Sequence, residues 1–397
     1  MDLLERLAEP AHIDDPFPYL AWLRENDPLS LAADGKYYAC RHADVVRVLS
    51  ADGFRNPEVP PGEPASDYQR MLRGGMTFKN PPEHARLRGP VSRAFTARRV
   101  DGLRPAMARI TDRLLDVVDE PLRDGGTVDL HGALSVLLPM EVTAELIGVP
   151  PEDRDEVAAL VRTIVPVLSS ATASEQHQAA ADDASGLLQT YFQRLIASRA
   201  GSPRDDLVSA LVTAEDRLTE EELISTLATL WIAGFETTAS VIDHGVLAMT
   251  RYPDELRWLR GGHGEAMMFA EEVLRQQSVV LFAAIPRIAT HEVELSGGLV
   301  PKGAVVRVMP AAANRDPAAF AEPDLFLPGR FESPESPMLS LGHGMHLCVG
   351  ARLARTEVAV ALGKLHARFP GLVLADPPVR SRSVGLRVIE QLPVRLG

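Results

Sequence analysis

The chain has 397 residues, of which 46% are hydrophobic and 24% charged, as in a globular protein with a large core. Its formal net charge of -13 argues against a broad nucleic-acid surface, because phosphate binding needs clustered positive charge. Two cysteines are too few for a disulfide scaffold, and the acidic N-terminal stretch is typical of neither a signal peptide nor a membrane anchor. We therefore expect a cytoplasmic protein that binds neither nucleic acid nor a membrane.

Helical spacing of apolar residues dominates the first half of the chain. We expect a short helix around Tyr19–Glu25, a small hairpin that includes Lys36–Arg41, and a helix from about His42 to Leu49. The proline-rich stretch Asn56–Pro64 is predicted to be a loop. Further helices are predicted within residues 84–120, 138–147, 152–168 and 175–200.

A long helix is predicted from Thr219 to Arg251. Thr219 and Glu222 match a capping box, and no proline follows until Pro253. Such a helix would span roughly 45–50 Å at 1.5 Å per residue. Its middle is apolar on almost every face, which predicts burial through the centre of the molecule. Polar residues in mid-run, beginning with Glu236, argue against a membrane span.

After residue 280 the pattern changes to short strands. They are predicted at Val279–Thr290, Glu292–Leu295 and Ala304–Met309, and a final helix at Ala351–Arg368. The expected fold class is mainly α with a small β-rich portion, drawn from about 28–41, 279–310 and 371–397, in a single domain over residues 1–397.

The stretch from Leu341 to Gly350 contains three glycines and Cys348, just before the final helix. A cysteine at a helix N-terminus is stabilised as thiolate, which is the form that ligates haem iron. Two alternatives stay open on this chemistry alone. A single cysteine is often a small buried hydrophobe, as we expect for Cys40. His343, His346 and Cys348 could also bind zinc, although a fourth ligand is not evident.

This stretch resembles the haem-binding signature of the cytochrome P450 family, Phe-x-x-Gly-x-x-x-Cys-x-Gly. Gly344, Cys348 and Gly350 fit the signature, whereas Leu341 stands in place of the phenylalanine. The resemblance implies the cytochrome P450 fold with a long central helix over the haem, haem b held by Cys348 as axial ligand to iron, and O2 as co-substrate.

Further segments resemble the family's motifs in the same chain order. Glu272-x-x-Arg275 and the Pro-x-Arg-Phe segment with Arg330 imply a buried structural triad behind the haem. A histidine and an arginine four residues apart, His84 and Arg88, lie on one helix face and suit the haem propionates. By the same resemblance Arg287 and His346 are further propionate ligands.

Residues 233–238 resemble the family's acid–alcohol motif. Glu236 and Thr237 are the expected catalytic pair, because dioxygen reduction consumes protons that an acid and a hydroxyl can deliver. Ala233 and Gly234 are expected beside the haem, with Gly234 leaving space for oxygen. Phe235 stands where relatives often have histidine.

The expected function is a monooxygenase that hydroxylates or epoxidises a small, largely apolar molecule, with a role in secondary metabolism. A peroxygenase driven by hydrogen peroxide and a haem gas sensor without turnover are the alternatives. The substrate pocket is expected to draw on Pro57–Thr77, Thr229–Thr237, Val280–Ala284 and the turn at Val384-Gly385. Its expected apolar lining is Met71, Leu72, Met76, Ile232, Leu281, Phe282 and Val384.

Electrons are expected from NAD(P)H through a ferredoxin and a ferredoxin reductase, and the protein is expected to be a monomer. Basic side chains are candidates for docking an acidic redox partner. They are Arg98, Arg99, Arg352, Arg355 and Lys364.

Overall fold

The computed structural model describes residues 2–58, 66–169, 174–216 and 218–397. Most of the predicted loop Asn56–Pro64 therefore lies outside the described residues. The chain forms two compact units, each assembled from separate segments. Unit 1 comprises Met1–Pro57, Thr111–Ser135 and Thr237–Gly397, and unit 2 comprises Glu58–Ile110 and Val136–Glu236. Across the described ranges, no helix is apolar over a sufficient length to cross a membrane.

Unit 2 is built from helices. They are α5 (Asp67–Gly74), η1 (Met76–Phe78), α6 (Glu83–Ala94), the first half of α7 (Ala97–Arg123), α8 (Leu137–Ile147), η3 (Pro151–Asp153), α9 (Arg154–Ser169), α10 (Glu175–Gly201), α11 (Leu207–Val212) and the first half of α12 (Glu220–Arg251).

A buried ion pair fixes the end of α8 in this unit. Arg199 Nε donates to Asp206 at 2.5 Å, and Arg199 Nη2 donates to the carbonyl oxygen of Gly148 at 2.6 Å. Gly148 adopts the left-handed region at φ 93°, and a Cβ there would lie 2.2 Å from the Asp206 carboxylate. Only glycine satisfies both conditions at this position.

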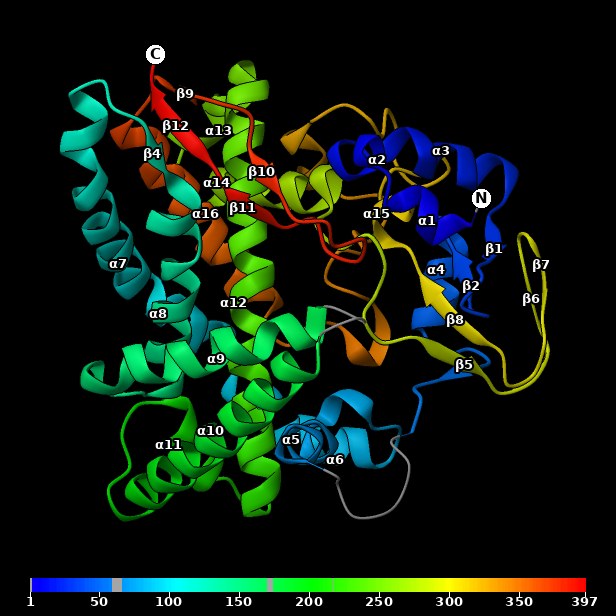
Figure 1. The fold of residues 1–397 in the computed structure, drawn as a ribbon, viewed down its shortest axis with the longest axis horizontal. Helices are drawn as coiled ribbons and strands as arrows, with labels where there is room; N and C mark the ends of the chain where they lie inside the picture. The colour runs from blue at the N-terminus through cyan, green and yellow to red at the C-terminus, as the bar shows by residue number, and fades with distance from the viewer. Residues whose placement is uncertain (1, 59–65, 170–173, 217) are drawn as a thin grey trace. The chain divides into compact units, whose positions relative to one another are not determined.

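Unit 1 holds the sheets. Its strands are β1 (Leu29–Leu31), β2 (Tyr37–Ala39), β3 (Phe54–Arg55), β4 (Val128–Asp129), β5 (Arg287–Ala289), β6 (Val293–Leu295), β7 (Gly298–Val300), β8 (Val305–Val308), β9 (Leu372–Leu374), β10 (Val379–Arg380), β11 (Ile389–Gln391) and β12 (Pro393–Leu396). The main sheet has the order β1-β2-β8-β5-β3, in which only β2 and β8 pair in parallel. Figure 1 shows β8, in yellow, beside β2, in blue, so chain segments far apart in sequence build this sheet.

The helices of unit 1 cover and extend these sheets. They are α1 (Leu3–Leu7), α2 (Pro10–Asp14), α3 (Phe17–Asn26), α4 (His42–Leu49), the second halves of α7 and α12, η2 (His131–Ser135), η4 (Pro253–Leu256), α13 (Arg257–Arg260), α14 (His263–Glu272), η5 (Val273–Gln277), α15 (Pro310–Ala313), η6 (Pro328–Glu332), η7 (Gly344–His346) and α16 (Ala351–Arg368). Apolar side chains of α4 and the main sheet form one core cluster, and those of α1, α3 and α15 form another.

The predicted long helix is confirmed as α12 (Glu220–Arg251). Its capping box forms: Thr219 N–H donates to Glu222 at 2.9 Å, and Glu222 N–H donates to the Thr219 hydroxyl at 3.3 Å. In the half within unit 1, Asp243 is fully buried and lies 2.8 Å from His131 Nδ1. The boundary between the two units falls between Glu236 and Thr237, so this helix contributes to both.

The mainly helical prediction is confirmed, and α4 and α16 have the predicted bounds. The predicted strand Val279–Thr290 is wrong over most of its length, because only Arg287–Ala289 is a strand. Pro286 cannot donate a ladder hydrogen bond, and Val280 makes an isolated bridge to Leu386. The two-residue strands β3 and β4 were missed, since they are too short for a periodic pattern.

Glu272 is the centre of a buried polar cluster at the end of α14. Arg275 donates to both Glu272 carboxylate oxygens at 2.7 Å, and both side chains are fully buried. Arg330 Nε donates to Glu272 at 3.2 Å, and Leu327 N–H donates at 2.7 Å. The carboxylate therefore accepts four hydrogen bonds while fully buried, and it joins α14 to the segment 327–330.

We predict that Glu272→Ala destabilises the protein by about 3–5 kcal/mol, because it leaves the Arg275 charge buried without a carboxylate. Urea unfolding monitored by circular dichroism measures the loss. Glu271→Ala is the matched control, since its partner Arg355 is 25% exposed and water can solvate that charge. Equal loss in the two variants would contradict the prediction.

Candidate functional site

The cysteine loop closes on itself immediately before α16. Cys348 N–H donates to the Leu341 carbonyl oxygen at 2.9 Å, and Leu347 N–H donates to that of Gly344 at 3.1 Å. Ala351, the first residue of α16, donates to the carbonyl oxygen of Cys348 at 3.2 Å. Cys348 is exposed and is not in a disulfide. Its position at a helix N-terminus favours the thiolate.

Two glycines shape this loop in different ways. Gly344 has φ +68°, and a Cβ on it would lie 2.7 Å from the Leu49 carbonyl oxygen at the end of α4, so glycine is required. A Cβ on Gly350 would lie 3.9 Å from Cys348 Sγ, which is ordinary contact. A side chain at position 350 would therefore clash with none of the described protein atoms. The glycine leaves space beside the sulfur.

Asn314 anchors the base of the loop, a role that was not predicted from the sequence. Its Nδ2 donates to the Ser340 hydroxyl at 2.7 Å and to the Ser278 hydroxyl at 3.0 Å, while its Oδ1 accepts from Leu339 N–H at 2.8 Å. Arg275 Nη1 donates to the Asn314 carbonyl oxygen at 2.8 Å. Hydrogen bonds therefore connect Glu272, through Arg275 and Asn314, to Ser340, the residue before Leu341. An asparagine directly after three buried alanines was the available signal.

Arg287 is a buried cation in unit 1. It is 6% exposed, and its Nη1 donates only to the nearby carbonyl oxygens of Ile285 and Pro286, at 3.1 and 3.2 Å. Burial lowers the pKa of this guanidinium to about 10. Among the residues that the structure describes, no carboxylate contacts it. An anion supplied by a ligand would compensate this charge.

His346 and Asn56 are also joined in unit 1. Asn56 Nδ2 lies 3.0 Å from His346 Nε2. This contact fixes the imidazole of the cysteine loop against the end of β3.

One face of α12 is exposed in an otherwise buried stretch. Ala233 and Thr237, one turn apart, are exposed, and Glu236 is half-buried. Phe235 and Thr238 are buried, at 7% and 4% exposure. Within unit 2, a Cβ on Gly234 would lie 3.1 Å from the Thr143 hydroxyl, so close packing on α8 is one reason for this glycine. Its role beside oxygen stays a prediction.

His84 and Arg88 lie one turn apart on α6 in unit 2. His84 is 3% exposed and Arg88 is half-buried. Both occupy the helical face predicted from their spacing.

Each unit, considered by itself, contains side chains of the kinds that bind haem. Unit 1 offers a cysteine at a helix start and a buried arginine that lacks a carboxylate, and unit 2 offers a buried histidine with an arginine one turn away. The zinc alternative is not supported, since the described ranges contain no group of three side chains able to hold a metal ion.

The predicted substrate residues group separately in the two units. In unit 1, Leu281 N–H donates to the Gly385 carbonyl oxygen at 3.0 Å, and Leu281, Phe282 and Val384 pack on the core cluster of α1 and α3. In unit 2, Met71, Met76 and Ile232 are buried and Leu72 is half-buried. Residues 59–65 of the predicted pocket segment lie outside the described residues. The role of these side chains in binding stays a prediction.

Several candidate docking charges already contact a carboxylate. Arg355 Nε lies 2.5 Å from Glu271, Lys364 Nζ lies 2.8 Å from Asp112, and Arg99 lies 3.5 Å from Asp205. Arg98 and Arg352 are exposed.

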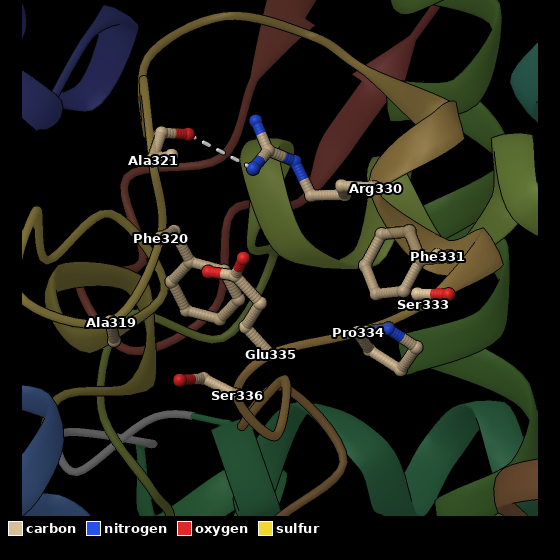
Figure 2. Close-up of a pocket in the computed structure, with 9 residues that line it drawn as sticks. All are labelled: Ala319, Phe320, Ala321, Arg330, Phe331, Ser333, Pro334, Glu335 and Ser336. Atoms are coloured by element: carbon tan, nitrogen blue, oxygen red, sulfur yellow. Dashed lines mark hydrogen bonds between the residues drawn. The ribbon is translucent and has the colours of Figure 1, made fainter.

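A small pocket of about 140 Å³ adjoins the Arg330 segment. Figure 2 shows the rings of Phe320 and Phe331 on either side of it, with Arg330 donating to the Ala321 carbonyl oxygen at 3.0 Å. Ligand pockets usually span about 300–1,000 Å³, so this pocket is too small for the expected substrate.

The family model for cytochrome P450 matches residues 152–260 and 266–383. The chain is 45% identical to cytochrome P450 BJ-3 of Bradyrhizobium diazoefficiens, over 100% of this chain and 96% of that one. It is 37% identical to the mycinamicin IV hydroxylase/epoxidase of Micromonospora griseorubida, over 94% and 93%. The structure of P450BioI in complex with hexadec-9Z-enoic acid ligated acyl carrier protein superposes with a TM-score of 0.88, at 30% identity over 98% and 99%.

We predict that the reduced protein with carbon monoxide shows the red-shifted Soret band of a thiolate-ligated haem. Cys348→Ala should lose this band. Cys40→Ala should keep it, because burial raises the pKa of the Cys40 thiol to about 12 and holds it protonated. A wild-type spectrum like that of a histidine-ligated globin would overturn the assignment of Cys348.

Proposed function

This chain belongs to the cytochrome P450 family, and we propose that it inserts one oxygen atom from O2 into a small, largely apolar molecule by hydroxylation or epoxidation. Members of this family are haem-thiolate monooxygenases. When bound, the haem supplies the activation of O2, which a thiolate ligand promotes by donating electron density to iron. The remaining work belongs to the side chains of this protein.

We propose that Cys348 is the iron ligand. The proposed partners of the propionates are His84, Arg88, Arg287 and His346. The lack of a carboxylate at buried Arg287 is the strongest support, because a buried cation is costly unless an anion compensates it. A propionate has the charge and the oxygen acceptors that a guanidinium needs.

Glu236 and Thr237 are the proposed proton-delivering pair. The Glu236 carboxyl gives a proton through water to Thr237 Oγ1, whose hydroxyl passes it on during dioxygen reduction. The exposure of Thr237 on a largely apolar helix supports this role, since a packing residue there would be buried like Thr238. A peroxygenase or a gas sensor has no need for such a pair. This observation therefore favours the monooxygenase.

In this proposal, electrons come from NAD(P)H through a ferredoxin and its reductase. Residues 1–397 act as one functional domain, and the protein is a monomer.

We place the reaction in secondary metabolism. The relative named mycinamicin IV hydroxylase/epoxidase supports this placement and the two reaction types.

The proposed function is tested in two steps. A compound library is first screened for shifts of the Soret band, and compounds that shift it are then turned over with ferredoxin, reductase and NADPH under labelled O2. The proposal requires substrate-dependent NADPH consumption and one labelled oxygen atom per product. Product formed only with hydrogen peroxide would favour the peroxygenase, and no product under either condition would favour a sensor.

Thr237→Ala should uncouple electron use from oxidation. We expect NADPH consumption to continue and hydrogen peroxide to be released, while product per NADPH falls about tenfold or more, because general acid assistance is worth ~10²–10⁴-fold and water replaces part of it. NADPH, peroxide and product are measured together.

The matched control is Thr238→Ala, which removes a hydroxyl about 100° around the helix and should change coupling far less. Full product yield per NADPH in Thr237→Ala would show that Thr237 has no part in proton transfer.

A further inference from the structure

Arg387 is a further buried arginine that contacts no carboxylate among the described residues, and it lies in unit 1 beside the turn predicted to face the substrate. Arg387 N–H donates to the Val279 carbonyl oxygen at 2.8 Å, and Leu281 N–H donates to that of Gly385 at 3.0 Å. Between these two bonds, Val280 bridges Leu386. The backbone of Arg387 is therefore fixed to the segment that carries Leu281.

The guanidinium of Arg387 has few partners for its charge. Arg387 is 8% exposed, one of its Nη atoms donates to the Gln277 carbonyl oxygen, and its Cζ lies 4.8 Å from the centroid of the Phe17 ring. Its Nε is buried and has no acceptor. Burial, together with repulsion from Arg380 and Arg315, lowers the pKa of Arg387 to about 9.

Arg380 brings a second positive charge close to this segment, because β10 pairs with β11 and places Arg380 opposite Ile389, two residues after Arg387. Its Nη1 is buried without a hydrogen-bond partner, while its Nε lies 3.6 Å from Asp14, whose side chain is 77% exposed. Water therefore weakens the one carboxylate contact of Arg380.

His244 of α12 lies within electrostatic reach of both arginines. It is fully buried, its Nδ1–H donates to the Ser240 carbonyl oxygen at 2.8 Å, and its Nε2 has no partner. Burial lowers the pKa of His244 well below its usual range, and the charges of Arg387 and Arg380 lower it further. His244 is seven residues after Thr237, which places it two turns along the same helix face.

Two other buried arginines of this chain meet a buried acid. Arg275 contacts Glu272 and Arg199 contacts Asp206, each with both side chains almost fully buried. For Arg387, by contrast, the described part of the chain offers no carboxylate in contact. A buried charge of this kind is expensive unless a ligand supplies the counter-charge.

We propose that Arg387 and Arg380 bind a carboxylate of the substrate, so that the substrate class is an apolar molecule bearing one carboxylate. Guanidinium groups bind carboxylates through paired, charge-assisted hydrogen bonds, which are strong where water is excluded. The proposal rests on the proposed function for the oxidation itself.

Binding of one acid and its ester tests the proposal. The probes are hexadec-9Z-enoic acid and its methyl ester, which share a chain and differ in charge. Affinity is measured by the Soret shift of the ferric protein and by calorimetry, which does not depend on the haem band. We expect the wild-type protein to bind the acid about tenfold or more tighter than the ester, as charged hydrogen bonds predict.

Arg387→Gln and Arg380→Gln should each remove most of this preference and leave ester binding nearly unchanged. Arg380→Gln is the safer variant, because Arg387 also donates to Gln277 and its loss can impair folding. Arg382→Gln is the matched control, since this neighbouring arginine is exposed and should keep the preference.

An acid that does not bind, or that binds no tighter than its ester, would overturn the proposal, as would a preference retained in both variants. These outcomes are separate from failure of the proposed function. That failure would appear as a missing thiolate band or missing oxidation, whatever the calorimetry of the two probes.

Discussion

The Glu272 carboxylate organises the structure around the cysteine. It neutralises Arg275 in a fully buried place, and the remaining donors of Arg275 are then directed at backbone carbonyl oxygens, among them that of Asn314. Asn314 in turn holds Ser340 and Leu339 at the base of the cysteine loop. Because each member depends on the geometry of the one before, a single carboxylate determines where the loop begins.

Buried charge also distinguishes structural residues from ligand-binding ones in this chain. An arginine that meets a buried carboxylate, such as Arg275 or Arg199, has its counter-charge within the protein. Arg287 and Arg387 are also buried, but their guanidinium groups donate hydrogen bonds to carbonyl oxygens and contact no carboxylate among the groups described. Carbonyl dipoles offset part of the desolvation cost, whereas the net charge stays uncompensated until an anion binds. The haem propionates and a substrate carboxylate are the anions we propose.

The sequence predicted correctly several helices whose signals come from residues only a few positions apart. The Thr219–Glu222 capping box, the periodicity of α4 and the helix after Cys348 all depend on residues a few positions apart, and all appear in the structure. The strand predicted at Val279–Thr290 failed because β-branched residues there pair through isolated contacts rather than a ladder. Arg330 was predicted as a partner of Glu272 only from the resemblance to the cytochrome P450 family. The Glu-x-x-Arg spacing alone is typical of an ordinary surface pair. The contacts of Asn314 and Asn56 were not predicted, because their amides contact residues distant in the chain.

The segmented construction of unit 1 has a consequence for how the protein is made. The parallel pairing of β2 with β8 and the bond from Arg24 Nη1 to the Ala312 carbonyl oxygen, 288 residues later, cannot form until most of the chain has left the ribosome. At about 5–20 residues per second, the N-terminal hairpin waits on the order of tens of seconds with one strand edge unpaired. An unpaired edge is a site for wrong association. Growth temperature and chaperone supply should therefore affect the yield of correctly folded protein.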